Sequence, residues 1–201
     1  MIANLATQKP PTTLKIGGKI YPVDVDYLTW IEITGLFDEF DFKAMQQPGS
    51  VLDEIDVKTL KRIEKLAFGG LIRESAGDVL AAVTTFACGY PQPHGERSGL
   101  KAKRRVLDFE QDLNSIIIAI RDQSGIDLTK KGDTPFHWWR FLVEFHNLTG
   151  EHHICKLMEL RAYDGDDKDM KRARDAVALP PKITQRARQQ EDEMAKLFYG
   201  C

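Results

Sequence analysis

Residues 105–142 read RVLDFEQDLNSIIIAIRDQSGIDLTKKGDTPFHWWRFL, and this stretch decides the fold. Asp108 and Gln111 have the spacing of a capping box, which predicts the start of a helix. Apolar residues then recur at helical offsets until Gly125, a residue typical of a left-handed helix end. Thr134 followed by Pro135 predicts the N-cap and first position of another helix. The stretch therefore predicts two helices in succession.

The rest of the chain predicts a small hairpin and more helices. Gly17 and Gly18 separate two short runs, 13–16 and 19–21, and both glycines tolerate the positive φ of a two-residue turn. The other predicted helices are 26–40 capped by Asp26, Asp56 to Gly69, 78–87, one capped by Thr149, a charged one to about Leu179, and 183–198. We expect a mainly α fold, a helical bundle-like domain with a small N-terminal β-hairpin and a polar C-terminal helix.

Four segments follow from these patterns. Residues 1–90 hold the hairpin and the first helices, and residues 91–104 are rich in glycine and proline, which indicates a flexible loop or linker. Residues 105–180 form the helical core motif region. Residues 181–201 form a C-terminal helical tail with few apolar residues.

Composition favours a protein of the reduced cytosol. Basic and acidic residues nearly cancel, 28 against 30, so a strong field for nucleic acid is not expected. The longest apolar run, Ile116–Ile120, is far shorter than the roughly 20 residues that cross a bilayer. Three scattered cysteines form no disulfide framework, and the N-terminus lacks a signal-peptide pattern. We expect neither a membrane nor a nucleic acid as partner.

Two clusters could hold a metal, and each has a simpler interpretation. Residues 164–169 are acidic, but Asp169 stands where a calcium-binding loop needs its glycine, which favours a solvated loop. His152, His153 and Cys155 lack a second ligand pair, and adjacent histidines on a helix diverge by about 100°. Cys155 with a histidine could form a nucleophile, yet it falls on an apolar helix face. We expect no catalytic, cofactor-binding or metal site.

The charged clusters also have simpler structural interpretations. Asp108, Glu110 and Asp112 could form a carboxylate pair, but capping and the helix dipole account for them. The basic runs 101–105 and 171–174 could contact nucleic acid, but no aromatic residue interleaves with either, which favours solvated charge.

Two adjacent tryptophans on the helix after Pro135 cannot share one face. Phe136, Trp139 and Val143 lie at i, i+3 and i+7, so we expect Trp139 to be buried and Trp138 to be more exposed. Tryptophan and arginine are favoured interface anchors. Burial of both tryptophans in the core is an equally supported alternative. The candidates for partner binding are Trp138, Arg140 and Phe141.

The chain also resembles a phage family, the gene-product-fifteen family encoded beside the tape-measure gene in long-tailed phages of Gram-positive hosts. The residues that carry the resemblance are 21–27 (YPVDVDY), 108–112 (DFEQD), 125–128 (GIDL), 137–141 (HWWRF), 156–161 (KLMELR) and 178–180 (ALP). These ordered motifs span most of the chain.

The resemblance implies a role in tail assembly, because genes of this family lie beside the tape-measure gene. It implies a non-enzymatic, chaperone-like tail assembly factor that binds the tape-measure protein in the host cytoplasm. The alternative is a structural component of the tail or head–tail junction, located in the virion. Other tail proteins are further candidate partners, and the oligomeric state, including a homo-oligomer, is left open.

Overall fold

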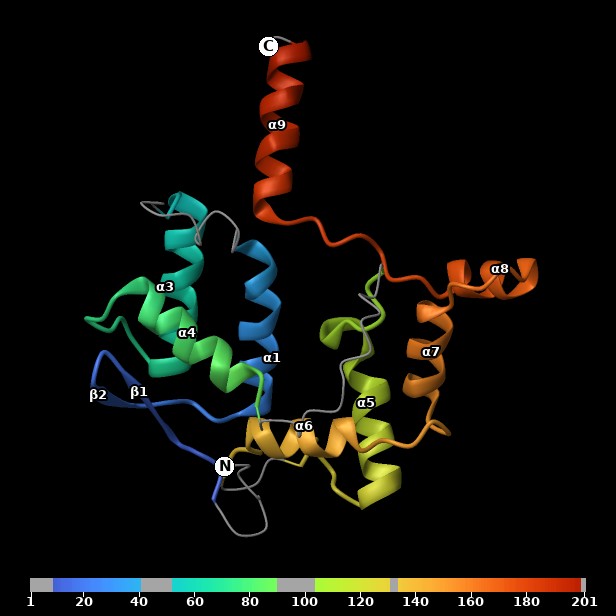
Figure 1. Ribbon diagram of the computed structural model, residues 1–201, viewed down its shortest axis with the longest axis horizontal. Coiled ribbons are helices and arrows are strands. Elements are labelled where there is room, and N and C mark those ends of the chain that lie inside the picture. The colour runs from blue at the N-terminus through green and yellow to red at the C-terminus, as the bar shows by residue number, and fades with distance from the viewer. Residues whose placement is uncertain (1–8, 41–51, 90–103, 131–133, 200–201) are drawn as a thin grey trace. The chain divides into compact units, whose positions relative to one another are not determined.

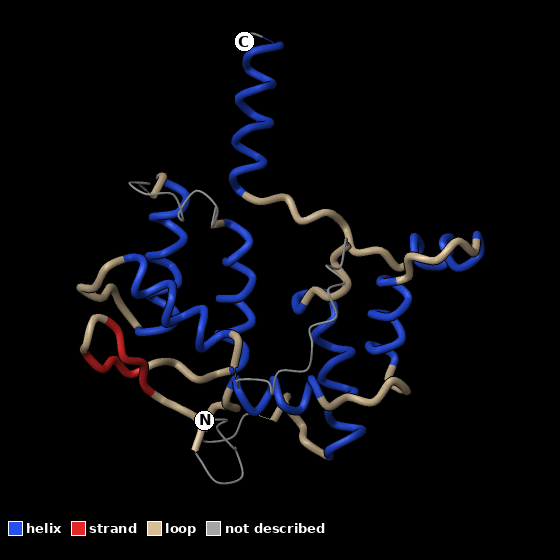
Figure 2. Tube along the Cα trace, in the orientation of Figure 1, coloured by secondary structure: helices blue, strands red, loops and turns tan. Residues whose placement is uncertain are grey.

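The computed structural model describes residues 9–40, 52–89, 104–130 and 134–199, and they are mainly helical (Figures 1 and 2). The chain divides into two compact units. The aromatic unit comprises residues 1–10 and 88–180, and the hairpin unit comprises residues 11–87 and 181–201. The mainly α fold with a small N-terminal hairpin is confirmed. The predicted loop or linker, 91–104, lies outside the described residues except for Arg104.

The hairpin forms where the paired glycines predict it. Strands β1 (Thr13–Ile16) and β2 (Lys19–Pro22) are antiparallel, with Ile16 opposite Lys19. Gly17 and Gly18 have φ values of 56° and 87°, the left-handed region that favours glycine. Lys19 Nζ and the Tyr21 hydroxyl both donate to Glu74 Oε1, at 2.9 and 2.6 Å. This carboxylate ties β2 to the loop before α4.

Three helices complete the core of the hairpin unit. They are α1 (Tyr27–Leu36), which continues into the 3-10 turn η1 (Phe37–Glu39), α3 (Glu54–Phe68) and α4 (Ala76–Ala87). Trp30 of α1 packs on Phe86 of α4 with ring centroids 4.4 Å apart, and its indole Nε1 donates to Asp24 O at 2.6 Å. Other fully buried side chains of this unit include Ile16, Ile33, Ile63, Ala67, Val79 and Val83.

The helix ends in this unit largely follow the sequence signals. Asp26 accepts the Leu28 N–H, as predicted for a cap, and Gly69 ends α3 with a φ of 73°. The predicted start at Asp56 is wrong, because Asp53 caps α3 by accepting the Asp56 N–H at 2.8 Å. Asp56 is therefore inside the first turn, where its side chain is buried.

Glu64 is a buried acid on α3, and burial is the main cause that raises the pKa of its carboxyl. The Ile72 N–H and Lys61 partly oppose this shift. Because the pKa of Glu64 is higher in the folded than in the unfolded protein, protonation of this carboxyl raises the free energy of unfolding. This stabilisation is fully present below the ordinary glutamate pKa and is lost as the pH rises through the pKa of the folded state.

We therefore expect Glu64→Gln to be more stable than the wild type near pH 8, with the difference shrinking towards about pH 4. Urea unfolding across this range measures it. Glu54→Gln on the same helix is the contrast, because the Lys58 side chain lowers the pKa of Glu54 and its substitution should not stabilise at high pH. A constant difference for Glu64→Gln at every pH would contradict the assignment.

The aromatic unit contains α5 (Phe109–Ser124), α6 (Trp138–His146), α7 (His153–Ala162) and α8 (Lys168–Ala176). Helix α5 contacts α6 and α7, and α7 contacts α8. Asp108 accepts the N–H groups of Glu110 and Gln111, at 2.8 and 3.2 Å, which confirms the predicted cap. Gly125 ends α5 with a φ of 73°, as predicted.

Two predicted helix starts in this unit are wrong. Helix α6 begins at Trp138, and His137 rather than Thr134 is its cap, with Nδ1 accepting the Trp139 N–H at 3.0 Å. Helix α7 begins at His153, because Thr149 O accepts the His152 N–H in a turn that precedes the helix. After Thr149 the chain makes this turn before it enters the helix, whereas at Thr134 it bends and has no regular structure at 135 and 136.

The last helix, α9 (Gln185–Tyr199), belongs to the hairpin unit although it follows the aromatic unit in sequence. Thr184 Oγ1 accepts the Ala187 N–H at 3.1 Å and so caps its first turn. No helix among the described residues is both long and apolar enough to span a membrane.

Candidate interaction site

Helix α6 is held by a stack of aromatic rings on its inner face. Trp138 and Phe141 are 1% and 0% exposed, and their rings stack with centroids 5.5 Å apart. Phe145 continues the stack 6.2 Å from Phe141. Phe109 of α5 lies 5.7–6.2 Å from all three rings. These contacts place α6 firmly against α5, because aromatic pairs in such geometries add to the free energy of burial.

The structure corrects the predicted phase of this helix. Trp138 is buried and Trp139 is only half-buried, the reverse of the prediction. Phe141, proposed as a binding residue, is also a core residue. The inward row is 138, 141, 142 and 145, which is an i, i+3, i+4, i+7 pattern of large apolar residues. That row was visible in the sequence, but the misplaced helix start favoured the row through Phe136 instead.

The outer face of α6 keeps one predicted binding residue accessible. Arg140 is exposed, and its Cζ lies 5.8 Å from the centroid of the Phe136 ring, which is a cation–π distance. Trp139 lies beside it on the helix and is half-buried, with its ring 6.4 Å from that of His137. We call Phe136, Trp139 and Arg140 the α6 outer surface.

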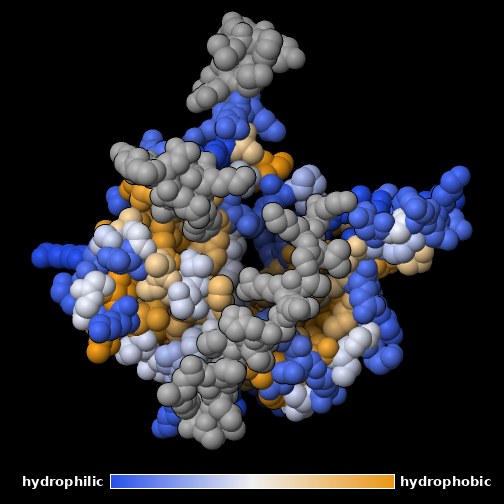
Figure 3. Space-filling view, in the orientation of Figure 1, coloured by the Kyte–Doolittle hydropathy of each residue, from blue (hydrophilic) through white to orange (hydrophobic). Residues whose placement is uncertain are grey.

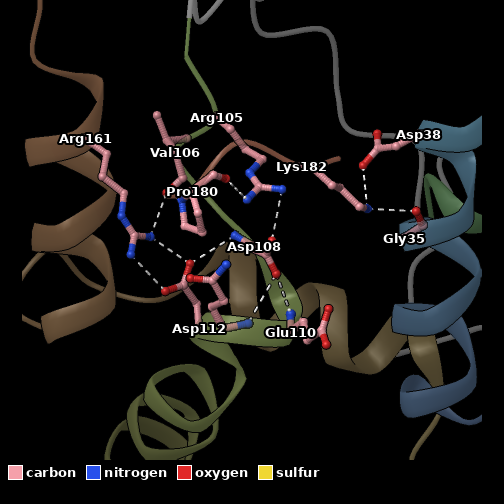
Figure 4. Close-up of polar contacts among 11 residues, drawn as sticks. Gly35, Asp38, Arg105, Val106, Asp108, Glu110, Asp112, Arg161, Pro180 and Lys182 are labelled. Carbon is pink, nitrogen blue, oxygen red and sulfur yellow. Dashed lines mark hydrogen bonds and ion pairs between the residues drawn. The ribbon is translucent and has the colours of Figure 1, made fainter. Parts of the chain in front are cut away.

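A buried ion pair joins α5 to α7 in the same unit (Figure 4). Arg161 Nη1 and Nη2 donate to the two carboxylate oxygens of Asp112 at 2.7 and 3.1 Å. The two side chains are 8% and 5% exposed. This fork-to-carboxylate geometry provides two parallel hydrogen bonds from a charged donor, the strong form of such contacts.

The remaining donors of Arg161 organise the chain around the pair. Nη1 also donates to Val106 O at 3.1 Å, and Nε donates to Val177 O at 2.8 Å. Asp112 in turn accepts the Asp108 N–H at 3.0 Å. One guanidinium therefore connects the entry to α5, the helix α7 and the segment after α8.

Sequence reasoning missed this pair by assigning Asp112 to the helix dipole. A signal was present, because Arg161 falls on the row of Ile154 and Leu157, the apolar face of its helix. An arginine on an apolar row requires a buried acceptor. The sequence did not show which carboxylate that would be.

Nearby, a second arginine fixes the segment that leaves the unit. Arg105 Nη2 donates to Pro180 O at 2.8 Å, and Nη1 lies 3.1 Å from Asp108 Oδ2 (Figure 4). The start of α5 and the end of the aromatic unit are thus linked by the same cluster of polar contacts.

The structure gives each cluster considered for metal or nucleophilic chemistry a local role. No group of three or more His, Cys, Asp and Glu residues that could hold a metal ion occurs in the described part of the chain. In the acidic loop, Asp167 caps α8 by accepting the N–H groups of Asp169 and Met170. His152 Nε2 lies 3.1 Å from Gln123 Oε1. Burial, and then the charge of Glu159, raises the pKa of the Cys155 thiol, the opposite of nucleophile activation.

The basic run on α8 is balanced by acids. Lys171, Arg172 and Arg174 lie 3.3, 3.4 and 2.8 Å from the carboxylates of Asp166, Asp169 and Asp175. The helix forms a mainly hydrophilic surface (Figure 3). The basic residues of this run are therefore paired with nearby acidic residues in the folded protein. In the other run, only Arg104 and Arg105 fall within the described residues.

The fold and these contacts define a mainly helical protein in which one of two compact units has a core of aromatic residues. Residues 7–179 match the family described as Bacteriophage Gp15 protein, so the chain belongs to this family. No curated protein and no solved structure matches the chain. The family resemblance predicted from the ordered motifs is confirmed, and α9 lies outside the matched residues.

Proposed function

We propose that this protein is a tail assembly factor that binds the tape-measure protein in the host cytoplasm, acting by binding and not by catalysis. Its family is a bacteriophage family, which favours a structural or assembly role for a phage-encoded protein. The finer role, chaperone-like binding of the tape measure, rests on the gene position that the resemblance implies.

The α6 outer surface is the observation that supports a binding role most directly. Arg140 is exposed above the Phe136 ring, and Trp139 is half-buried beside it. Tryptophan and arginine are enriched among the residues that contribute most to protein–protein binding. The buried stack of Trp138 and Phe141 beneath them makes the helix a rigid support. A helical partner could dock here by placing an apolar stripe on the half-buried rings.

Co-expression with a tape-measure fragment that is insoluble alone tests the proposal. We expect the wild type to keep the fragment in solution, because apolar stripes covered by a partner do not aggregate. Arg140→Ala should reduce the soluble fraction, while Arg172→Ala on α8, which is 82% exposed, should not. Equal precipitation of the fragment with and without the wild-type protein would contradict the chaperone role.

Mass spectrometry of purified virions separates the two assembly roles. A protein lost during maturation should be missing from virions, as a chaperone would be. A stoichiometric signal would instead favour a structural component of the tail or head–tail junction.

A further inference from the structure

The start of α9 carries positive charge where a helix favours negative charge. The dipole of a helix places partial positive charge at its N-terminus. Helix α9 has no acidic residue in its first turn, and Lys182 precedes it while Arg186 and Arg188 lie near its start. The beginning of this helix therefore needs compensating negative charge from elsewhere.

Carboxylates of the hairpin unit supply that charge. Lys182 Nζ donates to Asp38 Oδ2 at 2.7 Å and to Gly35 O at 2.8 Å (Figure 4). The Gln185 N–H, one of the unpaired donors of the first turn, donates to Glu39 Oε2 at 2.8 Å. A side chain from the end of η1 therefore helps to cap α9 from outside the helix.

Arg186 completes the attachment at the start of α3. Its Nη1 pairs with Asp53 Oδ2, and its Nη2 donates to Asp56 Oδ1 at 2.9 Å. The Asp56 N–H, and then the Arg186 side chain, lower the pKa of the Asp53 carboxyl, so the carboxylate is charged at neutral pH. One arginine thus holds two carboxylates of the same helix start.

Among the described side chains of residues 182–186, apolar packing contributes little to this attachment. Ile183, the apolar residue between the two basic ones, is 50% exposed. The side chains of Lys182, Asp38, Arg186 and Asp53 are 29–57% exposed, so ions of the solvent reach most of the pairs. Exposed ion pairs are weak singly and are weakened further by salt.

We infer that residues 182–186 form an electrostatic latch, which docks α9 on the carboxylates of Asp38, Glu39, Asp53 and Asp56 and opens when those charges are screened. Opening removes the Glu39 cap and the compensating charge from the first turn. A helix of 15 residues is marginal in water by itself, so α9 loses helical structure when the latch opens. Docking and folding of α9 are therefore one coupled step.

Hydrogen exchange of the full-length protein tests the latch. In the wild type, the protection of amides in 185–199 should fall about fivefold or more between low and high sodium chloride, while the protection of α5 changes little. Arg186→Gln should show the low protection already at low salt. Arg188→Gln removes the same charge from an exposed residue two positions along the helix and should behave as the wild type.

Arg186→Gln leaves Asp56 without this arginine, which can also destabilise α3. Exchanging the charges of Lys182 and Asp38 tests the latch without changing Asp53 or Asp56. Lys182→Glu should lower α9 protection about fivefold, and adding Asp38→Lys to it should restore most of that protection at low salt. Protection of α3 should stay constant in both. The inference is overturned if wild-type α9 protection does not respond to salt, or if Asp38→Lys gives no recovery.

Discussion

Trp138→Ala is expected to destabilise the aromatic unit by about 3–5 kcal/mol, the range for truncating a large aromatic residue in a core. Trp138 is 1% exposed and contacts both Phe109 and Phe141, so the substitution leaves a cavity between α5 and α6. Urea unfolding should show a lower midpoint, and hydrogen exchange should locate the loss of protection in α5 and α6.

Trp139→Ala is the matched control, since it changes the same residue type one position along the helix. Because Trp139 is half-buried and points about 100° away from Trp138 around α6, its removal should cost clearly less stability. The assigned helix phase is wrong if Trp139→Ala destabilises the protein more than Trp138→Ala does.

Arg161→Met is expected to destabilise the same unit by about 3–5 kcal/mol, because it leaves the Asp112 carboxylate buried without its partner. It also removes the donors to Val106 O and Val177 O, so the segments on either side of the pair should lose hydrogen-exchange protection. Chemical unfolding at neutral pH gives the change in free energy.

Two variants show whether burial of the pair is the cause. Arg121→Met removes an exposed arginine of α5, 3.8 Å from Asp122, and should cost less than about 1 kcal/mol. Combining Asp112→Leu with Arg161→Met should recover part of the loss, because an apolar pair leaves no buried charge. If Arg161→Met and Arg121→Met lower the stability equally, the pair at Asp112 is not the stabilising contact that the geometry indicates.

The local signals of the sequence predicted many of the elements correctly. Gly17 and Gly18 form the hairpin turn, Asp26 and Asp108 cap their helices, and Gly69 and Gly125 end theirs. Each of these features depends on the backbone of a residue and on neighbours within about one helical turn. The neighbours that decide the conformation are therefore adjacent in the sequence as well.

Where two local solutions compete, the sequence alone was insufficient. Thr134 and Pro135 form a credible helix start, yet the chain bends at Thr134, has no regular structure at 135 and 136, and His137 caps α6 instead. The choice changes which tryptophan is buried, because consecutive residues on a helix point about 100° apart. Packing of Trp138 and Phe141 against Phe109 selects the observed phase.

The sequence by itself determined the mainly helical fold class, the hairpin, the helix caps at Asp26 and Asp108, the glycine ends at Gly69 and Gly125, and the family. Only the tertiary structure decided the partners of the charged residues. Asp112 and Arg161 are 49 residues apart, and Arg186 and Asp56 are 130 apart. A carboxylate on a helix surface has the same local sequence pattern whether it faces water or an arginine from a distant helix. The two carboxylates become different only when the helices pack, because packing excludes water from one carboxylate and leaves the other exposed.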